Sequence, residues 1–149
     1  MPDVKFFWVG GIPFKNLGAD YHAMQNMIKS APDNLTVTGV IPLEAVKDYY
    51  VAADLFVLPA MQENHPMCVL EAAGAGLPII LRDIPQYDDT FKGDAVMAKT
   101  DDEFLDLIDL LRKDKKAYSK ACLGAEKIAK RFDSSAGAER LGEFYRSLI

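Results

Sequence analysis

Short apolar runs alternate along much of this chain with stretches of helical periodicity, and this alternation limits the folds open to it. The apolar runs predict strands over residues 4–9, 35–38, 55–58, 78–82 and, more briefly, 95–97. Helical spacing of apolar residues lies between them, over residues 17–31, 42–52 and 66–75. Strands that alternate with helices in this way predict right-handed βαβ units and an α/β fold, a parallel sheet with helices on both faces.

The last third of the chain predicts helices only. Residues 101–112 begin with acidic and end with basic side chains, which suits the helix dipole. Two further helices are expected over residues 115–131 and 135–148. The 149 residues, half of them apolar, have the size and balance of one ordinary globular domain. Because no linker, repeat or low-complexity run interrupts them, a single domain over residues 1–149 is expected.

Composition and charge exclude several classes of protein. The net charge of −5 argues against a surface that follows nucleic-acid phosphates. No window is apolar enough to span a membrane, and the amino terminus lacks the pattern of a secretory signal. Cys68 and Cys122 are expected to be small buried thiols in a reducing compartment, and neither His22 nor His65 has neighbours at metal-ligand spacing. A cytoplasmic location and no metal site are therefore expected.

The loops that follow the strands are where a ligand is expected, because open parallel sheets bind ligands beyond the carboxyl ends of their strands. These loops are residues 10–15, 39–42, 59–66 and 82–87. The third of them carries Glu63 and leads into a predicted helix with Pro66 in its first turn. Proline suits that turn because its missing N–H would have no intrahelical partner there.

This loop and its helix combine donors for an anion with acceptors for hydroxyl groups. The amides of Met67, Cys68 and Val69 are expected in the first turn without intrahelical partners, and together with the helix dipole they form an anion site. Glu71 follows about one turn later. Because a carboxylate can accept from two neighbouring sugar hydroxyls, the segment offers a phosphate cradle flanked by two hydroxyl acceptors, Glu63 and Glu71.

Two glutamates at this spacing also arise by chance, and Glu71 would then be an ordinary helix acid. The setting favours the site, because the pair lies between a strand that ends in proline and a Gly-x-Pro turn into the next strand. The segment resembles the Glu-x7-Glu signature of glycosyltransferase family 4 and related GT-B enzymes. Residues 6–11, 35–40 and 53–59 resemble that family in the same order. The resemblance implies one half of a GT-B fold, a Rossmann-like donor-binding domain with a helical carboxy-terminal tail.

The resemblance implies a role for each residue of the motif. Glu63, taken as the catalytic-site residue, contacts hydroxyls of the donor sugar. Glu71 holds the nucleotide ribose. Main-chain amides between the two glutamates bind the sugar and the phosphates, which implies Met67, Cys68 and Val69. The motif therefore predicts a binding segment for a nucleotide diphosphate sugar.

Candidates outside the two glutamates and these amides follow from the same resemblance. The loop after the second strand usually meets the nucleotide base through its backbone, which implies Val40 and Ile41. The glycine turn after the first strand lies near the site in the family, so Gly10 and Gly11 are candidates, with an ordinary tight turn as the alternative. The ring of His65 either binds the donor or lies at the rim of the pocket.

The chain departs from the family's pattern in three respects. Many relatives carry Phe-Gly where His65-Pro66 stands here, and Pro66 has no N–H to offer the sugar. The Arg and Lys that clamp the diphosphate belong to a βα unit that would precede Val4, and Lys15 is a poor substitute for them. That first βα unit and the amino-terminal acceptor domain are expected to be missing from this sequence.

The function implied by the resemblance is retaining transfer of a hexose from a nucleotide diphosphate sugar, with a UDP-sugar favoured and neither metal nor cofactor required. The isolated chain is expected to bind its donor weakly and to transfer nothing. Residues 82–87 resemble a segment of synthases that glycosylate diacylglycerol, which implies a lipid acceptor and a full-length enzyme at the inner face of the membrane; a plain strand-to-turn connection is the alternative. A non-catalytic nucleotide-binding module and a GT-B sugar-nucleotide epimerase stay open as other functions.

Overall fold

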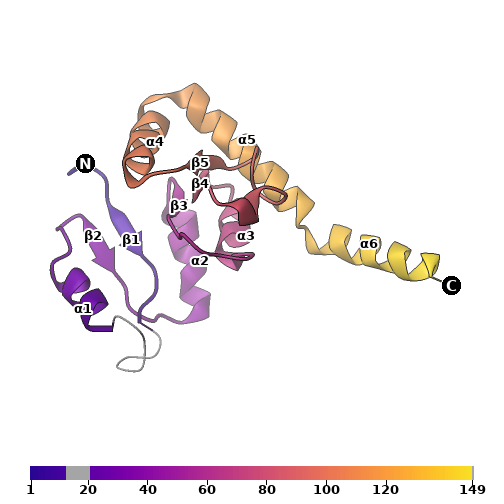
Figure 1. Cartoon of the computed structure of the whole chain (residues 1–149), viewed down its shortest axis with the longest axis horizontal. Helices are drawn as coiled ribbons and strands as arrows, with labels where there is room; N and C mark the ends of the chain where they lie inside the picture. The colour runs from indigo at the N-terminus through magenta and orange to yellow at the C-terminus, as the bar shows by residue number, and fades with distance from the viewer. Residues whose placement is uncertain (13–20, 149) are drawn as a thin grey trace. The chain divides into compact units, whose positions relative to one another are not determined.

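The computed structural model describes residues 1–12 and 21–148, and the chain divides into two compact units, Met1–Val51 and Ala52–Ile149 (Figure 1). Every strand pair of the described residues is parallel, and helices lie on both sides of the strands. The predicted α/β fold class is therefore confirmed. A single domain over the whole chain stays a prediction.

The first unit is built from two strands and two helices, namely β1 Phe6–Trp8, α1 Tyr21–Lys29, β2 Leu35–Val37 and α2 Leu43–Ala52, whose last residue passes the unit boundary. β1 and β2 are parallel, with Phe6 opposite Leu35. Phe7 of β1 contacts Tyr49 of α2, with 5.9 Å between the ring centroids. α2 begins at Leu43, one residue after the predicted start at Pro42, whereas residues 17–20 of the predicted first helix and Lys15 lie outside the described residues.

The second unit contains a three-stranded parallel sheet in the order β3-β4-β5. Its strands are β3 Phe56–Leu58, β4 Ile79–Arg82 and β5 Val96–Ala98. All four residues of the central strand β4 are buried. A near-continuous apolar run is what a parallel strand covered on both faces requires, which explains why the run over residues 78–82 predicted this strand.

Helices make up the rest of the second unit: α3 Met67–Gly74, the 3-10 helix η2 Pro85–Tyr87, α4 Asp101–Lys113, α5 Lys115–Arg131 and α6 Ser134–Ser147. The starts of the last two are fixed by aspartate caps. The Asp114 carboxylate accepts from the second and third amides of α5 at 2.8 and 3.1 Å, and the Asp133 carboxylate does the same for α6 at 3.0 and 3.1 Å. The predicted tail helices are confirmed at both starts to within one residue.

α5 approaches the loop before β5 more closely than a side chain would permit. A Cβ atom added at Gly124 would lie 1.9 Å from the carbonyl oxygen of Asp94. The carboxylate of Asp94 pairs with Arg131, and it lies 3.8 Å from the Nζ of Lys127. Arg131 also donates to the carbonyl of Thr90 at 2.5 Å. Glycine at position 124 therefore allows the helix to dock on this loop, and ion pairs hold its carboxyl-terminal half there.

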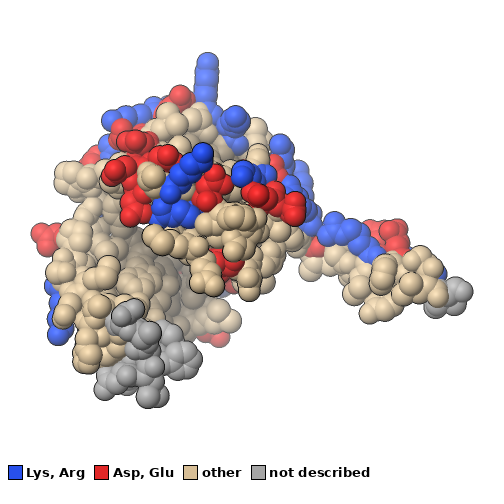
Figure 2. All heavy atoms as spheres, in the orientation of Figure 1, with Lys and Arg blue, Asp and Glu red and all other residues tan. Residues whose placement is uncertain are grey.

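Acidic and basic side chains are mixed over the part of the second unit that faces the viewer in Figure 2. Lys92 Nζ, for example, lies 2.8 Å from Asp88 and 3.3 Å from Asp83. Lys113 Nζ lies 2.6 Å from Asp109 one turn earlier on α4. Such exposed pairs contribute little to stability individually. Within residues 1–12 and 21–148, no helix is both long and apolar enough to cross a membrane.

Candidate functional site

Arg82 connects the carboxyl ends of the strands in the three-stranded sheet. Its side chain, only 8% exposed, donates to the carbonyl of Pro59 from Nε at 3.4 Å and from Nη2 at 3.3 Å. It also donates to the carbonyl of Lys99 at 3.1 Å and pairs with Asp101 at 2.5 Å. One guanidinium at the end of β4 thus binds the residues that follow β3 and β5. Sequence reasoning missed this role, although a lone charge at the end of an apolar strand was a usable signal.

The start of α3 differs by one residue from the prediction. Pro66 is the residue before the helix, with φ −70° and the extended ψ of 116°, rather than a member of the first turn. No side chain caps this end, and no acidic residue lies in the first turn. The Val69 amide was expected to have no partner, but its N–H donates to the carbonyl of Pro66 at 3.1 Å; its role in donor binding stays a prediction. Anion binding by the amides of Met67 and Cys68 stays a prediction. Although burial raises the pKa of the Cys68 thiol, hydrogen bonds from the backbone of Val69 and Cys68 lower it.

The other end of α3 is fixed by a glycine. Gly76 has φ +76°, and its N–H donates to the carbonyl of Ala73 at 2.9 Å while Leu77 donates to that of Ala72 at 3.1 Å. This is the Schellman arrangement, which ends a helix and turns the chain back. Because Ala72, Ala73 and Val69 face the core, Glu71 lies on the exposed side of α3.

Glu63 and Glu71 both act electrostatically on Cys68. Burial raises the pKa of the half-buried Cys68 thiol first, and the negative charges of Glu63 and Glu71 raise it further. Glu63 is half-buried and also acts on Tyr87, whose pKa is raised to about 12 by burial and then by the charges of Glu63 and Cys68. The structure therefore brings both predicted glutamates to the first turn of α3. Cys68 and Cys122 are half-buried, not buried as expected, because each lies at the edge of its helix's core face.

His65 packs into an aromatic cluster, defined here as His65, Tyr87, Phe91 and Phe132. The His65 ring stacks on Phe91, with centroids 5.5 Å apart and planes 17° apart, and contacts Phe132 at 5.0 Å. Phe91 in turn meets Tyr87 edge to face at 5.3 Å. The exposed ring of His65 thus connects the loop of Glu63 to Phe132, the residue that follows α5.

The candidate site residues of the first unit lie in two loops that contact each other. Gly10, with φ +140°, bridges Gly39, and its N–H donates to the hydroxyl of Thr38 at 3.1 Å. A Cβ atom added at Gly11 would lie 3.1 Å from the backbone nitrogen of Val40. The glycine turn after β1 therefore lies against the loop of Val40 and Ile41. The side chain of Val40 in this loop is 81% exposed.

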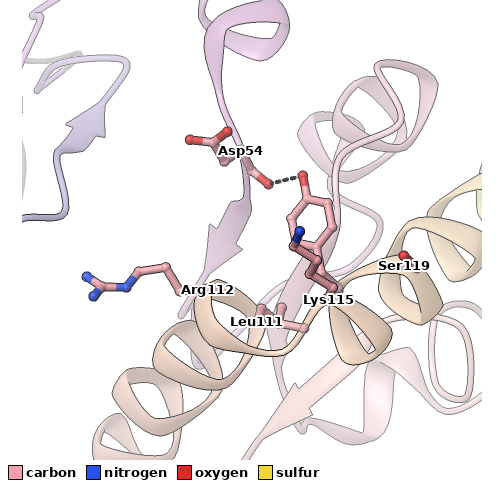
Figure 3. A pocket seen from close by; sticks show the side chains of 6 residues that line it. Asp54, Leu111, Arg112, Lys115 and Ser119 are labelled. Carbon is pink, nitrogen blue, oxygen red and sulfur yellow. Dashed lines mark hydrogen bonds between the residues drawn. The ribbon is translucent and has the colours of Figure 1, made fainter.

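A shallow hollow of about 460 Å³ lies elsewhere in the second unit, lined by Asp54, Leu111, Arg112, Lys115, Tyr118 and Ser119. The Tyr118 hydroxyl donates to the Asp54 carbonyl at 3.1 Å. Arg112 points away from Asp54 (Figure 3). Asp54 precedes β3, whereas the Glu63 loop follows that strand. The hollow therefore lies at the opposite end of the sheet, where parallel sheets do not bind their ligands. In the described part of the chain, no group of three or more His, Cys, Asp or Glu is arranged to hold a metal ion.

The two glutamates make Cys68 a reporter of their charge. In a Cys122→Ala variant, which leaves one thiol, alkylation of Cys68 by iodoacetamide should reach its half-maximal rate above the ordinary thiol pKa of 9.0. Glu63→Gln and Glu71→Gln should each move that midpoint to lower pH, because removal of a nearby negative charge favours the thiolate. Glu126→Gln, on the exposed side of α5, is the control. An unchanged midpoint in both glutamine variants would contradict the effect of the two carboxylates on Cys68.

Comparison with known proteins decides the family. Residues 1–114 match the family described as glycosyl transferases group 1. The chain belongs to this family. Two curated relatives are the alpha-galactosylglucosyldiacylglycerol synthase of Streptococcus pneumoniae, 36% identical over 93 residues, and the processive diacylglycerol alpha-glucosyltransferase of Acholeplasma laidlawii, 33% identical over 89 residues. The resemblance to GT-B enzymes of family 4 is confirmed, and the names of both relatives refer to diacylglycerol.

These relatives are much longer than the chain. Their aligned regions cover 62% and 60% of this chain but only 25% and 26% of the relatives. The solved structure of HepE from Anabaena in complex with UDP-glucose is similar in fold, with a TM-score of 0.79 and 17% identity. That similarity covers 99% of this chain and 42% of HepE. The chain thus has the fold of one part of a larger glycosyltransferase.

Proposed function

We propose that this chain is the donor-binding part of a retaining hexosyltransferase and that the segment from Glu63 to Glu71 holds a UDP-sugar. The observation that carries the proposal is that the charges of Glu63 and Glu71 both act on Cys68, in the first turn of α3. That turn has neither a side-chain cap nor an acid of its own. Family membership and the UDP-glucose bound by HepE support the choice of ligand.

The arrangement divides the donor among three kinds of group. The positive end of the α3 dipole and the amides of Met67 and Cys68 receive the phosphates. The exposed carboxylate of Glu71 receives the ribose hydroxyls, and the half-buried carboxylate of Glu63 receives hydroxyls of the sugar. A base-binding role for Val40 and Ile41 stays a prediction from the sequence. No step of this binding calls for a metal ion.

The acceptor we propose is a membrane glycolipid. The names of both curated relatives refer to diacylglycerol, and they supply the support for this choice. Transfer would then take place at the inner face of the membrane and would need the acceptor domain. The 149-residue chain alone is expected to bind a UDP-sugar weakly and to leave it unchanged, which product analysis by chromatography checks.

A nucleotide-binding module without catalysis is the second candidate. Two observations favour it. Pro66 has no N–H, and the N–H of Val69 already donates to the carbonyl of Pro66. The sugar end of the site therefore has fewer donors than the nucleotide end. A chain that binds UDP and UDP-glucose with the same affinity would favour this candidate over the transferase.

Glu63→Ala should distinguish binding of the sugar from binding of the nucleotide. Loss of a charged acceptor for sugar hydroxyls should weaken UDP-glucose about tenfold, while UDP, which lacks the sugar, should change less than about twofold. Isothermal titration calorimetry of the 149-residue chain with both ligands measures this difference. Glu126→Ala, an exposed glutamate on α5, should leave both affinities unchanged. Equal losses for UDP and UDP-glucose would rule out a sugar-binding role for Glu63.

A further inference from the structure

Tyr87 is a buried tyrosine whose hydroxyl has no hydrogen-bond partner. The residue is 1% exposed, and its hydroxyl is the one buried side-chain polar atom without a partner in the part of the chain that the structure describes. Folded proteins almost always pair such groups, because a buried unsatisfied hydroxyl loses the hydrogen bonds it had with water. A partner that is absent here is therefore expected in some state of the protein.

The backbone and ring of Tyr87 are fixed in place, so its hydroxyl cannot move to reach that partner. Its N–H donates to Ile84 at 3.0 Å, and its carbonyl accepts from Thr90, Phe91 and Lys92 at 3.2, 3.0 and 3.0 Å. The ring packs edge to face on Phe91. Because the tyrosine is fixed from both sides, the missing partner has to move to it.

Glu63 is the group that can do so. Phe91 lies between Tyr87 and His65, so the tyrosine is part of the aromatic cluster beneath the loop of Glu63. Burial and the charges of Glu63 and Cys68 raise the pKa of Tyr87 to about 12, which keeps its hydroxyl a donor at neutral pH. Of these two neighbours, Glu63 has the carboxylate, and it is half-buried on a loop. It can therefore face both the tyrosine and a ligand.

We propose that Tyr87 is a positioning residue whose hydroxyl donates to the Glu63 carboxylate when a UDP-sugar is bound. A hydroxyl bonded to a carboxylate is a strong, charge-assisted contact, and it would fix one Glu63 oxygen so that the other faces the sugar. Tyr87 itself is too buried to touch the donor. The inference rests on the proposed role of Glu63 in binding the sugar. It adds that Tyr87 holds the Glu63 carboxylate in position for that role.

Tyr87→Phe removes the hydroxyl and keeps the ring. In calorimetric titrations of the 149-residue chain, this variant should weaken UDP-glucose about tenfold and change UDP by less than about twofold. Tyr118→Phe is the matched control, because the Tyr118 hydroxyl donates to Asp54 at the opposite end of the sheet. The control should bind both ligands as the unmodified chain does. Unchanged UDP-glucose affinity in Tyr87→Phe would overturn the inference.

Two further measurements separate positioning from a structural role. In a Glu63→Ala background, Tyr87→Phe should cause no additional loss of UDP-glucose affinity, because the tyrosine acts through the glutamate. Without ligand, Tyr87→Phe should keep or raise the melting temperature, since no hydrogen bond is lost, whereas Tyr118→Phe should lower it. A lower melting temperature with equal losses for UDP and UDP-glucose would show a structural role and overturn the inference. An unmodified chain that binds neither ligand would instead overturn the proposed function, and this inference with it.

Discussion

Gly124→Ala should destabilise the chain by about 3 kcal/mol, because the new methyl group overlaps backbone that has no room to yield. The added Cβ would lie 1.9 Å from the Asp94 carbonyl oxygen and 3.0 Å from the carbon that bears it. α5 would have to move away from the loop before β5, and its ion pairs from Lys127 and Arg131 to Asp94 would be disturbed. Urea unfolding followed by circular dichroism measures the loss.

Gly137→Ala is the control for this substitution. Gly137 lies in α6, and nothing stands within 4 Å of the position its Cβ would take. Alanine is the better helix former by about 0.5–1 kcal/mol, so this variant should be as stable as the unmodified chain or more stable. If Gly124→Ala were as stable as Gly137→Ala, α5 would not dock on Asp94 as described.

Glu71→Ala should cause the largest loss of nucleotide affinity of any single change in the site. Hydrogen bonds from ribose hydroxyls to a carboxylate contribute about 2 kcal/mol together, which is roughly thirtyfold in affinity. UDP and UDP-glucose share the ribose, so both should weaken by the same factor, unlike the selective loss expected for Glu63→Ala. Calorimetric titration with the two ligands distinguishes the two glutamates.

The fold of this variant is expected to persist. Glu71 lies on the exposed side of α3, and the residues that pack that helix, Val69, Ala72 and Ala73, are unchanged. Glu126→Ala again serves as the control, with no expected effect on either ligand. Equal binding of UDP by Glu71→Ala and the unmodified chain would contradict the ribose assignment.

Local signals explain why most elements could be predicted from the sequence. α5 begins at Lys115 as expected because Asp114 supplies a cap that the sequence displays directly. β4 was readable because its apolar run is continuous. η2 was not predicted, since a helix of three residues has no periodicity to detect. α3 begins one residue late because Pro66 keeps the extended ψ of a capping position.

The candidate site was predictable only where its residues are neighbours in the chain. Glu63 and Glu71 stood out through their setting, and the structure brings both to Cys68. The contacts of His65 with Phe91 and Phe132 join segments that are distant in the sequence, and no local sequence pattern predicts such packing. The unpaired hydroxyl of Tyr87 is likewise a property of the packed chain, not of residues 82–87 as a motif.

The central claim, that the start of α3 binds a nucleotide diphosphate sugar, is tested most directly by nuclear magnetic resonance. Amide signals of the isotope-labelled 149-residue chain would be assigned and followed during titration with UDP-glucose. The largest shifts are predicted at Met67 and Cys68 and in the adjoining loop of Glu63, with smaller ones near Glu71. Shifts confined to the hollow of Asp54 and Tyr118 at the other end of β3, or no shifts at any concentration, would contradict the claim.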